Sequence, residues 1–297
     1  MNTFLMAGLK LGIFLSKVVQ TCISLVRIIL LSRPVPPLPP PRKRACSILG
    51  NGPSLNTSIE KHLSVMQETE LVCVNRFSTS DYYEQLKPEN YVMIDPLFFS
   101  EEGRTRDIIV STFDALRAKT TWELNLYVPH KARHSAILKE LLAQRPNIKP
   151  VYFNYTIFEG VDFIKHFVFE KGIAMPQCEN VLVATLFLMI NRNFDVIYLY
   201  GADHSWHEQL RIREDNVLTL KDVHFYDADA TKVKEEVLYN SVSKEKSTMS
   251  RQFLSYSKAF RGYEVIKDYA DSKKKNTKIY NASAKSYVDA FERVRFS

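Results

Sequence analysis

The sequence predicts an α/β protein with a mostly parallel, Rossmann-like sheet that carries helices on both faces, preceded by an amphipathic N-terminal helix. From Ala45 onward, short apolar runs typical of buried strands alternate with stretches of helical periodicity. This alternation is typical of parallel sheets, because parallel neighbours need a crossover connection. The first run ends in a glycine-rich turn before a helix, and residues 1–44 differ in composition from residues 45–297.

Residues 1–32 are predicted to form an amphipathic helix that lies on a membrane surface. Apolar residues dominate this segment, but Lys10, Lys17 and Arg27 interrupt it, so no uncharged run approaches the roughly 20 residues that span a bilayer. On a helix these charges fall on one side, and most of the apolar residues lie opposite, which is the pattern of an interfacial anchor. A helix packed on the protein's own body or on a partner, and a spanning helix, are the alternatives.

Residues 33–44 are predicted to be a proline-rich basic linker. Six of the nine residues 33–41 are proline, which favours an extended polyproline II spacer. The basic end, Arg42-Lys43-Arg44, suits a position near anionic lipid headgroups. The linker therefore separates the N-terminal helix from a folded body that begins at residue 45.

The formal net charge of +7 belongs to this N-terminal arm. Residues 1–44 contain seven basic and no acidic side chains, whereas residues 45–297 carry 33 of each. A neutral body argues against nucleic acid as a partner, because nucleic-acid-binding domains need a basic face. The four cysteines form no C-x-x-C pair, so zinc and redox motifs are absent from the sequence.

Residues 45–297 are predicted to form one domain. The predicted strands, in chain order, are 46–49, 71–74, 91–94, 124–128, 151–153, 196–200 and 278–280. The predicted helices are 57–67, 107–117, 134–143, 180–190, a long charged stretch over about 231–270, and 287–294.

The strongest indication of a binding site is the segment Gly50-Asn51-Gly52-Pro53-Ser54, which joins the first predicted strand to a helix. Glycine lets a ligand approach the backbone closely, and the free N–H groups of a helix N-terminus attract phosphate. Ligands of doubly wound sheets bind at the carboxyl ends of the strands. The spacing is neither a G-x-G-x-x-G fingerprint nor a P-loop, so a tight turn without a ligand is the alternative.

Polar residues come after three other predicted strands at the same edge of the sheet. Asn75 and Arg76 come after the second strand, and Asp95 after the third. Amides in such positions suit recognition of a base or a ribose. Gly201-Ala-Asp203-His204-Ser-Trp206 comes after the strand at 196–200, where catalytic residues gather. We expect Asp203 and His204 to line the site as catalytic residues, and Trp206 to stack on a sugar or base. The alternatives are a loop cap for Asp203 and simple packing for Trp206.

These segments resemble, in the same order, the Cst-type bacterial sialyltransferases and the wider superfamily that includes MptE-like pterin diphosphokinases. The resemblance covers most of residues 45–295, weakly between the motifs. The residues that carry it are Gly50-Asn-Gly-Pro-Ser54, Val74-Asn-Arg-Phe77, Asp95-Pro-Leu-Phe-Phe99, Val196-Ile-Tyr-Leu-Tyr-Gly-Ala-Asp203 and Lys278-Ile-Tyr-Asn-Ala-Ser283.

The resemblance implies a variant GT-A glycosyltransferase fold, a CMP-sugar donor and no metal requirement. By position, Asn51 and Gly52 would contact the donor phosphate region and Asn75 the nucleotide. His224 falls roughly where the family has its general base, which would deprotonate the acceptor hydroxyl. An imidazole suits this task because its ordinary pKa is about 6.5. A loop histidine without a role is the alternative.

Three departures from the family pattern leave the donor open. Asp95 replaces an asparagine, Cys178-Glu179-Asn180 replaces Thr-Ser-Gly before the apolar helix, and the tyrosine-bearing lid is replaced by the segment that begins with His204-Ser-Trp-His207. Asn180 is still a candidate for nucleotide binding. Another nucleotide sugar, or ATP with Mg²⁺ as in the pterin kinases, is compatible with these changes. Asp227-Ala-Asp229 also has the D-x-D form of metal-dependent glycosyltransferases, although this pattern is common by chance.

We therefore expect a membrane-associated glycosyltransferase that transfers a sugar from a nucleotide donor, CMP favoured, to a glycan or glycolipid acceptor of the cell surface. The expected location is the cytoplasmic face of the inner membrane, as a peripheral or monotopic protein, with homo-oligomers left open. An MptE-like diphosphokinase and a non-catalytic scaffold of glycan assembly are the two alternatives.

Overall fold

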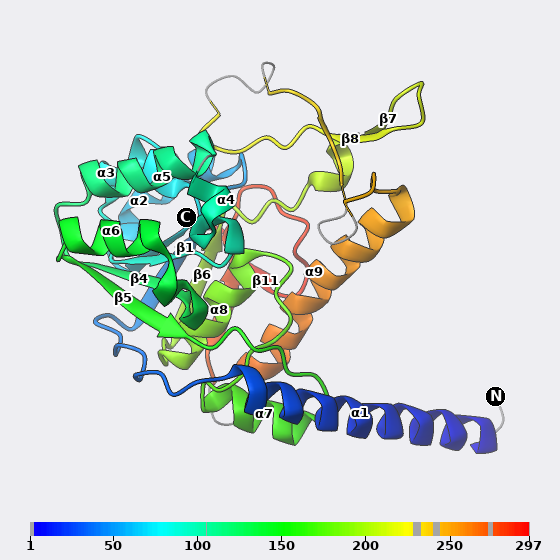
Figure 1. The fold of residues 1–297 in the computed structure, drawn as a ribbon. Coiled ribbons are helices and arrows are strands. Elements are labelled where there is room, and N and C mark those ends of the chain that lie inside the picture. The colour runs from blue at the N-terminus through cyan, green and yellow to red at the C-terminus, as the bar shows by residue number, and fades with distance from the viewer. Residues whose placement is uncertain (1–2, 105, 228–232, 240–243, 273–275, 297) are drawn as a thin grey trace.

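The central element of the structure is an eight-stranded sheet in which every neighbouring pair is parallel (Figure 1). The computed structural model describes residues 3–104, 106–227, 233–239, 244–272 and 276–296. The strands of this sheet are β1 (Ala45–Leu49), β2 (Glu70–Val74), β3 (Asn90–Val92), β4 (Leu124–Pro129), β5 (Ile148–Phe153), β6 (Val196–Tyr200), β10 (Lys278–Asn281) and β11 (Glu292–Arg293). The predicted α/β class is confirmed.

The strand order, β11-β10-β6-β1-β2-β3-β4-β5, places β1 at a topological switch point. From β1 the chain builds the sheet outward through β2 to β5, and it then returns to the other side of β1 with β6. The loops that leave β1 and β6 are therefore neighbours at the carboxyl edge of the sheet. Doubly wound sheets bind their ligands near such a switch point.

Helices cover both faces of the sheet, which forms two apolar cores. One core contains the helices α2 (Leu55–Gln67), α3 (Tyr82–Leu86), α5 (Asp107–Lys119) and α6 (Ala136–Gln144), with α4 (Glu101–Arg104) at its margin. The other contains α7 (Asp162–Glu170), α8 (Val181–Asn191) and α9 (Met249–Ala270). Alternate strand residues enter opposite cores, as Val72 and Val74 enter the second and Leu71 and Cys73 the first.

Short 3₁₀ helices connect several of these elements, namely η1 (Phe77–Thr79), η2 (Pro96–Phe99), η3 (His130–His134) and η4 (Trp206–Gln209). The most apolar helix, α8, is buried from Val181 to Ile190 because it lies between the sheet and α9. Gly262 of α9 makes this packing close, since a Cβ there would lie 3.0 Å from Cγ2 of Val183.

A small antiparallel sheet comes after β6 and lies beyond the carboxyl edge of the large one (Figure 1). It consists of β7 (Leu210–Ile212), β8 (Leu218–Leu220) and β9 (Glu236–Val237). The helix predicted over 231–270 is therefore wrong in its first half, where the described residues 233–239 include β9 and the helix begins only at Met249. Pairing with β8 overrides the local preference, as the N–H of Leu238 donates to the carbonyl of Leu218.

The predicted helix at 287–294 is also wrong. This segment contains bends at residues 290 and 291 and the strand β11. Val288 and Phe291 are buried in the core, and the side chain of Asn281 donates to the carbonyl of Val288. These contacts come from residues that precede the segment in the chain, so the local pattern alone does not indicate them.

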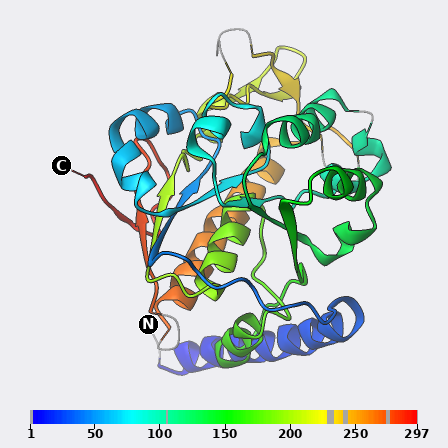
Figure 2. The same cartoon turned by 90° about the vertical axis from the view of Figure 1, so that its left-hand side faces the viewer.

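The N-terminal helix α1 (Thr3–Leu31) lies beside α7 and docks on the body through its polar side (Figures 1 and 2). Lys17 pairs with Asp162 at 2.8 Å, Ser24 Oγ lies 2.9 Å from the carbonyl oxygen of Glu159, and Thr21 accepts from the N–H of Val161. The hydrogen bond from Lys17 lowers the pKa of Asp162 to about 2. The polar side that the sequence pattern defines thus faces protein, and the apolar side is exposed.

The linker after α1 contains neither helix nor strand, but it is fastened to the body along its length (Figure 2). The N–H of Arg33 donates to Asn154 at 2.8 Å. Further along, the guanidinium of Arg192 donates to the carbonyls of Pro39 at 2.9 Å and Pro40 at 3.0 Å. The backbone N–H groups of Arg42 and Lys43 donate to the carboxylate of Glu70.

Arg192 and Glu70 form a buried ion pair beneath this linker. Their side chains are each 1% exposed, and Nη2 of Arg192 lies 2.9 Å from Oε2 of Glu70. Burial raises the pKa of Glu70, but Arg192 and the hydrogen bonds from Arg42 and Asn90 outweigh it and hold the pKa below its ordinary value. The pair therefore ties together β2, the end of α8 and the linker.

Removing one partner of this pair should be costly. Arg192→Met is expected to lower the free energy of unfolding by about 3–5 kcal/mol, because it leaves the carboxylate of Glu70 buried without a counter-ion. Urea unfolding measures the change. The control is Arg44→Met, whose pair with Asp195 is 92% and 52% exposed and should contribute less than about 1 kcal/mol. Equal effects of the two variants would contradict this account.

Candidate functional site

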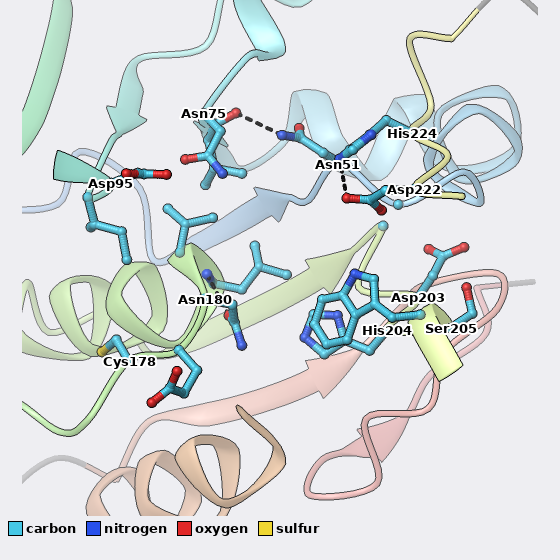
Figure 3. A pocket seen from close by; sticks show the side chains of 18 of the residues that line it. Asn51, Asn75, Asp95, Cys178, Asn180, Asp203, His204, Ser205, Asp222 and His224 are labelled. Atoms are coloured by element: carbon cyan, nitrogen blue, oxygen red, sulfur yellow. Dashed lines mark hydrogen bonds and ion pairs between the residues drawn. The ribbon is translucent and has the colours of Figure 1, made fainter. Parts of the chain in front are cut away.

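A pocket of about 400 Å³ opens at the carboxyl ends of β1, β2, β3 and β6 (Figure 3). Its walls come from the loops after these strands, the start of α8 and the segment that leads to residue 224. The predicted site residues that line it are Asn51, Gly52, Pro53, Asn75, Asp95, Asn180, Gly201, Asp203, His204, Trp206 and His224. Gly50, Ser54 and Arg76 lie outside the lining. The residues that line it without having been predicted include Tyr155, Ser205, Gln209 and Asp222.

The glycines of this edge allow the β1 and β6 loops to touch. The N–H of Gly50 donates to the carbonyl of Tyr200 at 2.8 Å, and the N–H of Gly52 donates to that of Gly201 at 2.9 Å. A Cβ at Gly50 would lie 2.5 Å from the oxygen of Gly201, and one at Gly52 would lie 2.2 Å from Oδ1 of Asp203. These two N–H groups are bonded within the protein, so they are not free to bind a phosphate.

Asp203 holds the N-terminus of α2. Its buried carboxylate accepts from the N–H of Ser54 at 3.0 Å and from Oγ of Ser54 at 2.6 Å. A negative charge at this position also suits the helix dipole. Burial raises the pKa of Asp203, while the two hydrogen bonds from Ser54 oppose the rise. The geometry gives this carboxylate a positioning role between the two loops, and Ser54 acts as its partner.

Three asparagine side chains face the pocket with an amide atom that has no partner among the described residues (Figure 3). These buried atoms are Oδ1 of Asn51, Oδ1 of Asn75 and Nδ2 of Asn180. The other end of Asn180 is occupied, since its Oδ1 accepts from the N–H groups of Leu182 and Val183 as the cap of α8. Buried polar atoms almost always have a partner, so these three indicate hydrogen bonds to a ligand. Together they offer two acceptors and one donor.

His204 lies deeper in the same pocket, in a left-handed conformation with φ of 50°. Its Nε2 is hydrogen-bonded to the hydroxyl of Tyr263, which donates in turn to Oδ1 of Asn180 at 3.2 Å. Since that hydroxyl has one proton, Nε2 of His204 must carry its own. Burial lowers the pKa of His204 to about 3, so the ring is neutral at neutral pH. His204 therefore positions Asn180 through Tyr263 and is poorly suited to accept a proton.

Aromatic rings extend this arrangement toward the pocket mouth. The indole of Trp206 stacks on His204, with ring centroids 4.2 Å apart and planes at 22°. On its other side Trp206 stacks on Tyr256 at 5.4 Å. The predicted stacking residue thus already packs between two rings, and it still lines the pocket.

His224 lies at the opposite wall with its side chain 30% exposed. Its Nε2 lies 3.7 Å from Oδ2 of Asp222, and its Nδ1 lies 3.8 Å from Oδ2 of Asp227. Burial raises the pKa of Asp222, and His224 opposes this rise. An accessible imidazole next to carboxylates can accept a proton and hold it, because the carboxylates stabilise the imidazolium.

The His224 segment is held onto the glycine loop. The N–H of Phe225 donates to the carbonyl of Asn51 at 3.1 Å, and Nδ2 of Asn56 donates to the carbonyl of Phe225 at 2.9 Å. Asp227 accepts from the backbone N–H of His224 at 2.7 Å, and Asp229 lies outside the described residues. The first acid of the D-x-D pattern is thus engaged by its own segment.

Asp95 and Arg76 lie at the rim of this arrangement. Asp95 is exposed and caps η2 by accepting from the N–H of Leu97 at 2.9 Å, and it also lines the pocket. The guanidinium of Arg76 lies 4.7 Å from the ring centre of Tyr226, outside the lining. Arg76 thus supports the His224 segment from behind, because Tyr226 stacks on His224.

No protein-family model matches the chain, and no curated protein matches it. Among solved structures, the chain is similar to the MAf glycosyltransferase from Magnetospirillum magneticum AMB-1, with a TM-score of 0.47 and 9% sequence identity. The alignment covers 93% of this chain and 37% of that protein, so the chain spans little more than a third of its neighbour's length.

A methyl group at Gly52 should push the two loops apart. Gly52→Ala is expected to lower the free energy of unfolding by about 1–3 kcal/mol, as overpacked sites do, because the new Cβ meets Asp203. Chemical unfolding measures the change. The control is Gly8→Ala, where nothing lies within 4 Å of the added Cβ. If both variants are as stable as the native chain, the loops do not depend on this contact.

Proposed function

We propose that the chain is a glycosyltransferase that binds a nucleotide sugar in this pocket and transfers the sugar to a hydroxyl of a glycan acceptor. The observation that supports this most is the set of three partnerless amide atoms, from Asn51, Asn75 and Asn180, in a pocket of about 400 Å³. A nucleobase and a ribose present donors and acceptors in close succession, which suits such a set. The volume is within the range of about 300–1,000 Å³ for small-molecule sites.

The charge of the lining favours a donor with few phosphates. The pocket is lined by Asp95, Glu179, Asp203 and Asp222, and within the described part of the chain no lysine or arginine lines it. A CMP-sugar carries one phosphate, whereas ATP carries three and needs cations to neutralise them. We therefore favour CMP as the nucleotide, and with it a sialyltransferase-like reaction. An MptE-like diphosphokinase, for which Mg²⁺ would have to supply the missing positive charge, is the weaker candidate.

In the proposed reaction His224 is the general base. It accepts the proton of the acceptor hydroxyl while the hydroxyl oxygen bonds to the anomeric carbon of the sugar. The bond from that carbon to the phosphate oxygen breaks, and its electron pair leaves with CMP. Asp222, 3.7 Å from Nε2, stabilises the imidazolium that forms. Asp203 and the neutral His204 keep the loops and Asn180 in place, so their roles in this proposal are positioning ones.

We further propose that α1 attaches the enzyme to a membrane, where a glycolipid or surface-glycan acceptor would be assembled. The support is the apolar side of α1, which is exposed over most of the helix. In a bacterial cell the cytoplasmic face of the inner membrane would supply both the donor and a lipid-linked acceptor of polysaccharide or lipopolysaccharide biosynthesis. The non-enzymatic alternative is a scaffold of glycan assembly that has this fold but binds no nucleotide-sugar donor.

A panel of nucleotides should identify the donor class. We expect CMP to raise the melting temperature more than UDP or ATP does. Asn75→Ala should weaken CMP binding about fivefold, the loss expected for one hydrogen bond of about 1 kcal/mol. Asn216→Ala is the matched control, because Asn216 has a φ of 58°, close to the 51° of Asn75, but lies in an exposed turn. No response to any nucleotide would favour the scaffold.

Replacing the proposed base should stop transfer without loss of the nucleotide. His224→Ala is expected to reduce kcat by about 10²–10⁴-fold, the usual contribution of a general base, with CMP affinity nearly unchanged. Initial rates with a fluorescent glycan acceptor measure kcat, and thermal shift measures the affinity for CMP. His207→Ala serves as the control, since His207 is exposed and outside the lining. Normal turnover by the His224 variant would refute this assignment.

A further inference from the structure

The helix α1 presents three different sides, as expected for about 3.6 residues per turn. The docked side contains Lys17, Thr21 and Ser24, all bonded to the segment between Glu159 and Asp162. The opposite side is apolar and exposed. Its exposed residues include Leu11, Leu15, Val19, Ile23, Val26 and Leu30. The neighbouring helix α7 adds two more exposed aromatic side chains, Phe163 (79%) and Phe167 (48%).

The third side of α1 faces α9 across an open groove. Gly8, Leu9, Gly12 and Ser16 line one wall, and Arg261 of α9 lies on the other, around a volume of about 680 Å³. A Cβ at either glycine would meet nothing within 4 Å, so the groove floor is open. Beside it lies a second pocket of about 300 Å³, which also contains Arg261.

The charged residues of this second pocket are four cations, Lys17, Lys165, Lys258 and Arg261, and two acids, Glu159 and Asp162. Lys17 and Lys165 both pair with Asp162. Lys258 and Arg261 are exposed, and among the residues that the structure describes neither has a hydrogen bond or an ion pair. Two free positive charges therefore sit at the inner end of a groove whose outer wall is an apolar helix. This arrangement matches a phospholipid, whose charged phosphate lies next to its apolar acyl chains.

The docking of α1 on the body also limits how α1 and α9 can contact a bilayer. The segment Gly8–Leu31 is long and apolar enough to cross a membrane. Residues 17–33 are, however, bonded to the loop before α7 and to Asn154, so a spanning helix would carry these polar groups into the hydrocarbon. A helix that lies in the interface buries only its outer side and leaves the α9 side at headgroup level.

We propose that the groove between α1 and α9 binds the phosphate of an anionic phospholipid, with Lys258 and Arg261 as the phosphate ligands and the outer side of α1 among the acyl chains. The proposal rests on the proposed membrane attachment and is independent of the proposed reaction. It adds a headgroup site on the catalytic body itself, so that α9 as well as α1 contacts the lipid.

Vesicle binding tests the headgroup site. Lys258→Ala/Arg261→Ala is expected to bind phosphatidylcholine vesicles that contain phosphatidylglycerol about 30-fold more weakly than the native chain at low salt, which corresponds to about 1 kcal/mol per charge. On phosphatidylcholine alone the two proteins should bind alike. The control variant, Lys61→Ala/Lys139→Ala, removes two exposed lysines from α2 and α6 and should leave binding unchanged. Loss of affinity in the control equal to that in the test variant would overturn the proposal, because binding would then depend on net charge alone.

A second variant separates this site from the attachment and from catalysis. Leu15→Glu/Val19→Glu should abolish binding to both kinds of vesicle, whereas Ile212→Glu, in the exposed hairpin, should not. If the Lys258/Arg261 variant binds anionic vesicles like the native chain, the headgroup site is wrong even where attachment through α1 holds. If the Leu15/Val19 variant also binds normally, attachment is wrong as well. CMP should raise the melting temperature of both variants as much as that of the native chain. This result would show that the substitutions leave the nucleotide pocket unchanged.

Discussion

The contact between the β1 and β6 loops sets the geometry of the whole carboxyl edge. Gly50 and Gly52 bring the first loop against Gly201, and Asp203 reaches across to hold Ser54 and the start of α2. The two loops would otherwise diverge at the switch point of the sheet. Because they are fastened to each other, the His224 segment has a fixed surface to lie on, and the three asparagines face one volume. A side chain as small as alanine at Gly52 would oppose this contact.

In the proposed reaction, the groups that position the pocket differ from the group that accepts the proton. The most buried ionisable groups, Asp203 and His204, are committed to Ser54 and Tyr263, and burial holds His204 neutral. His224, in contrast, is partly exposed, and its Nε2 lies 3.7 Å from the carboxylate of Asp222. This division has a physical reason, since a group that exchanges protons during turnover has to reach water or substrate in both of its charge states. The acidic, cation-free lining adds a preference for a lightly charged ligand.

Local patterns in the sequence predicted most of the sheet and the edge at which the pocket lies. The β-branched run before Gly201 and the glycines after Leu49 are short-range signals, and strands of a parallel sheet end at a common edge. The features that these local patterns did not predict depend on contacts with residues far away in the chain. Asp222 lies 3.7 Å from His224, and the resemblance that indicated His224 says nothing of Asp222. The bond from Phe225 to Asn51 holds the segment that carries both residues at the pocket. The same applies to β9, which needs β8 as its neighbour, and to the docking of α1, whose polar side the pattern alone assigns to water.

The linker has a consequence for how the enzyme would meet its acceptor. A proline-rich segment is usually pictured as a spacer that lets a body swing about its anchor. Here Arg33, the carbonyls of Pro39 and Pro40, and the N–H groups of Arg42 and Lys43 are all bonded to the body. These bonds fix the segment to the body and oppose a change in the angle between the outer side of α1 and the pocket mouth. With α1 attached to a membrane, as proposed, the pocket mouth would lie at a set height above the lipid. The chain would then select acceptors whose hydroxyl group reaches that height.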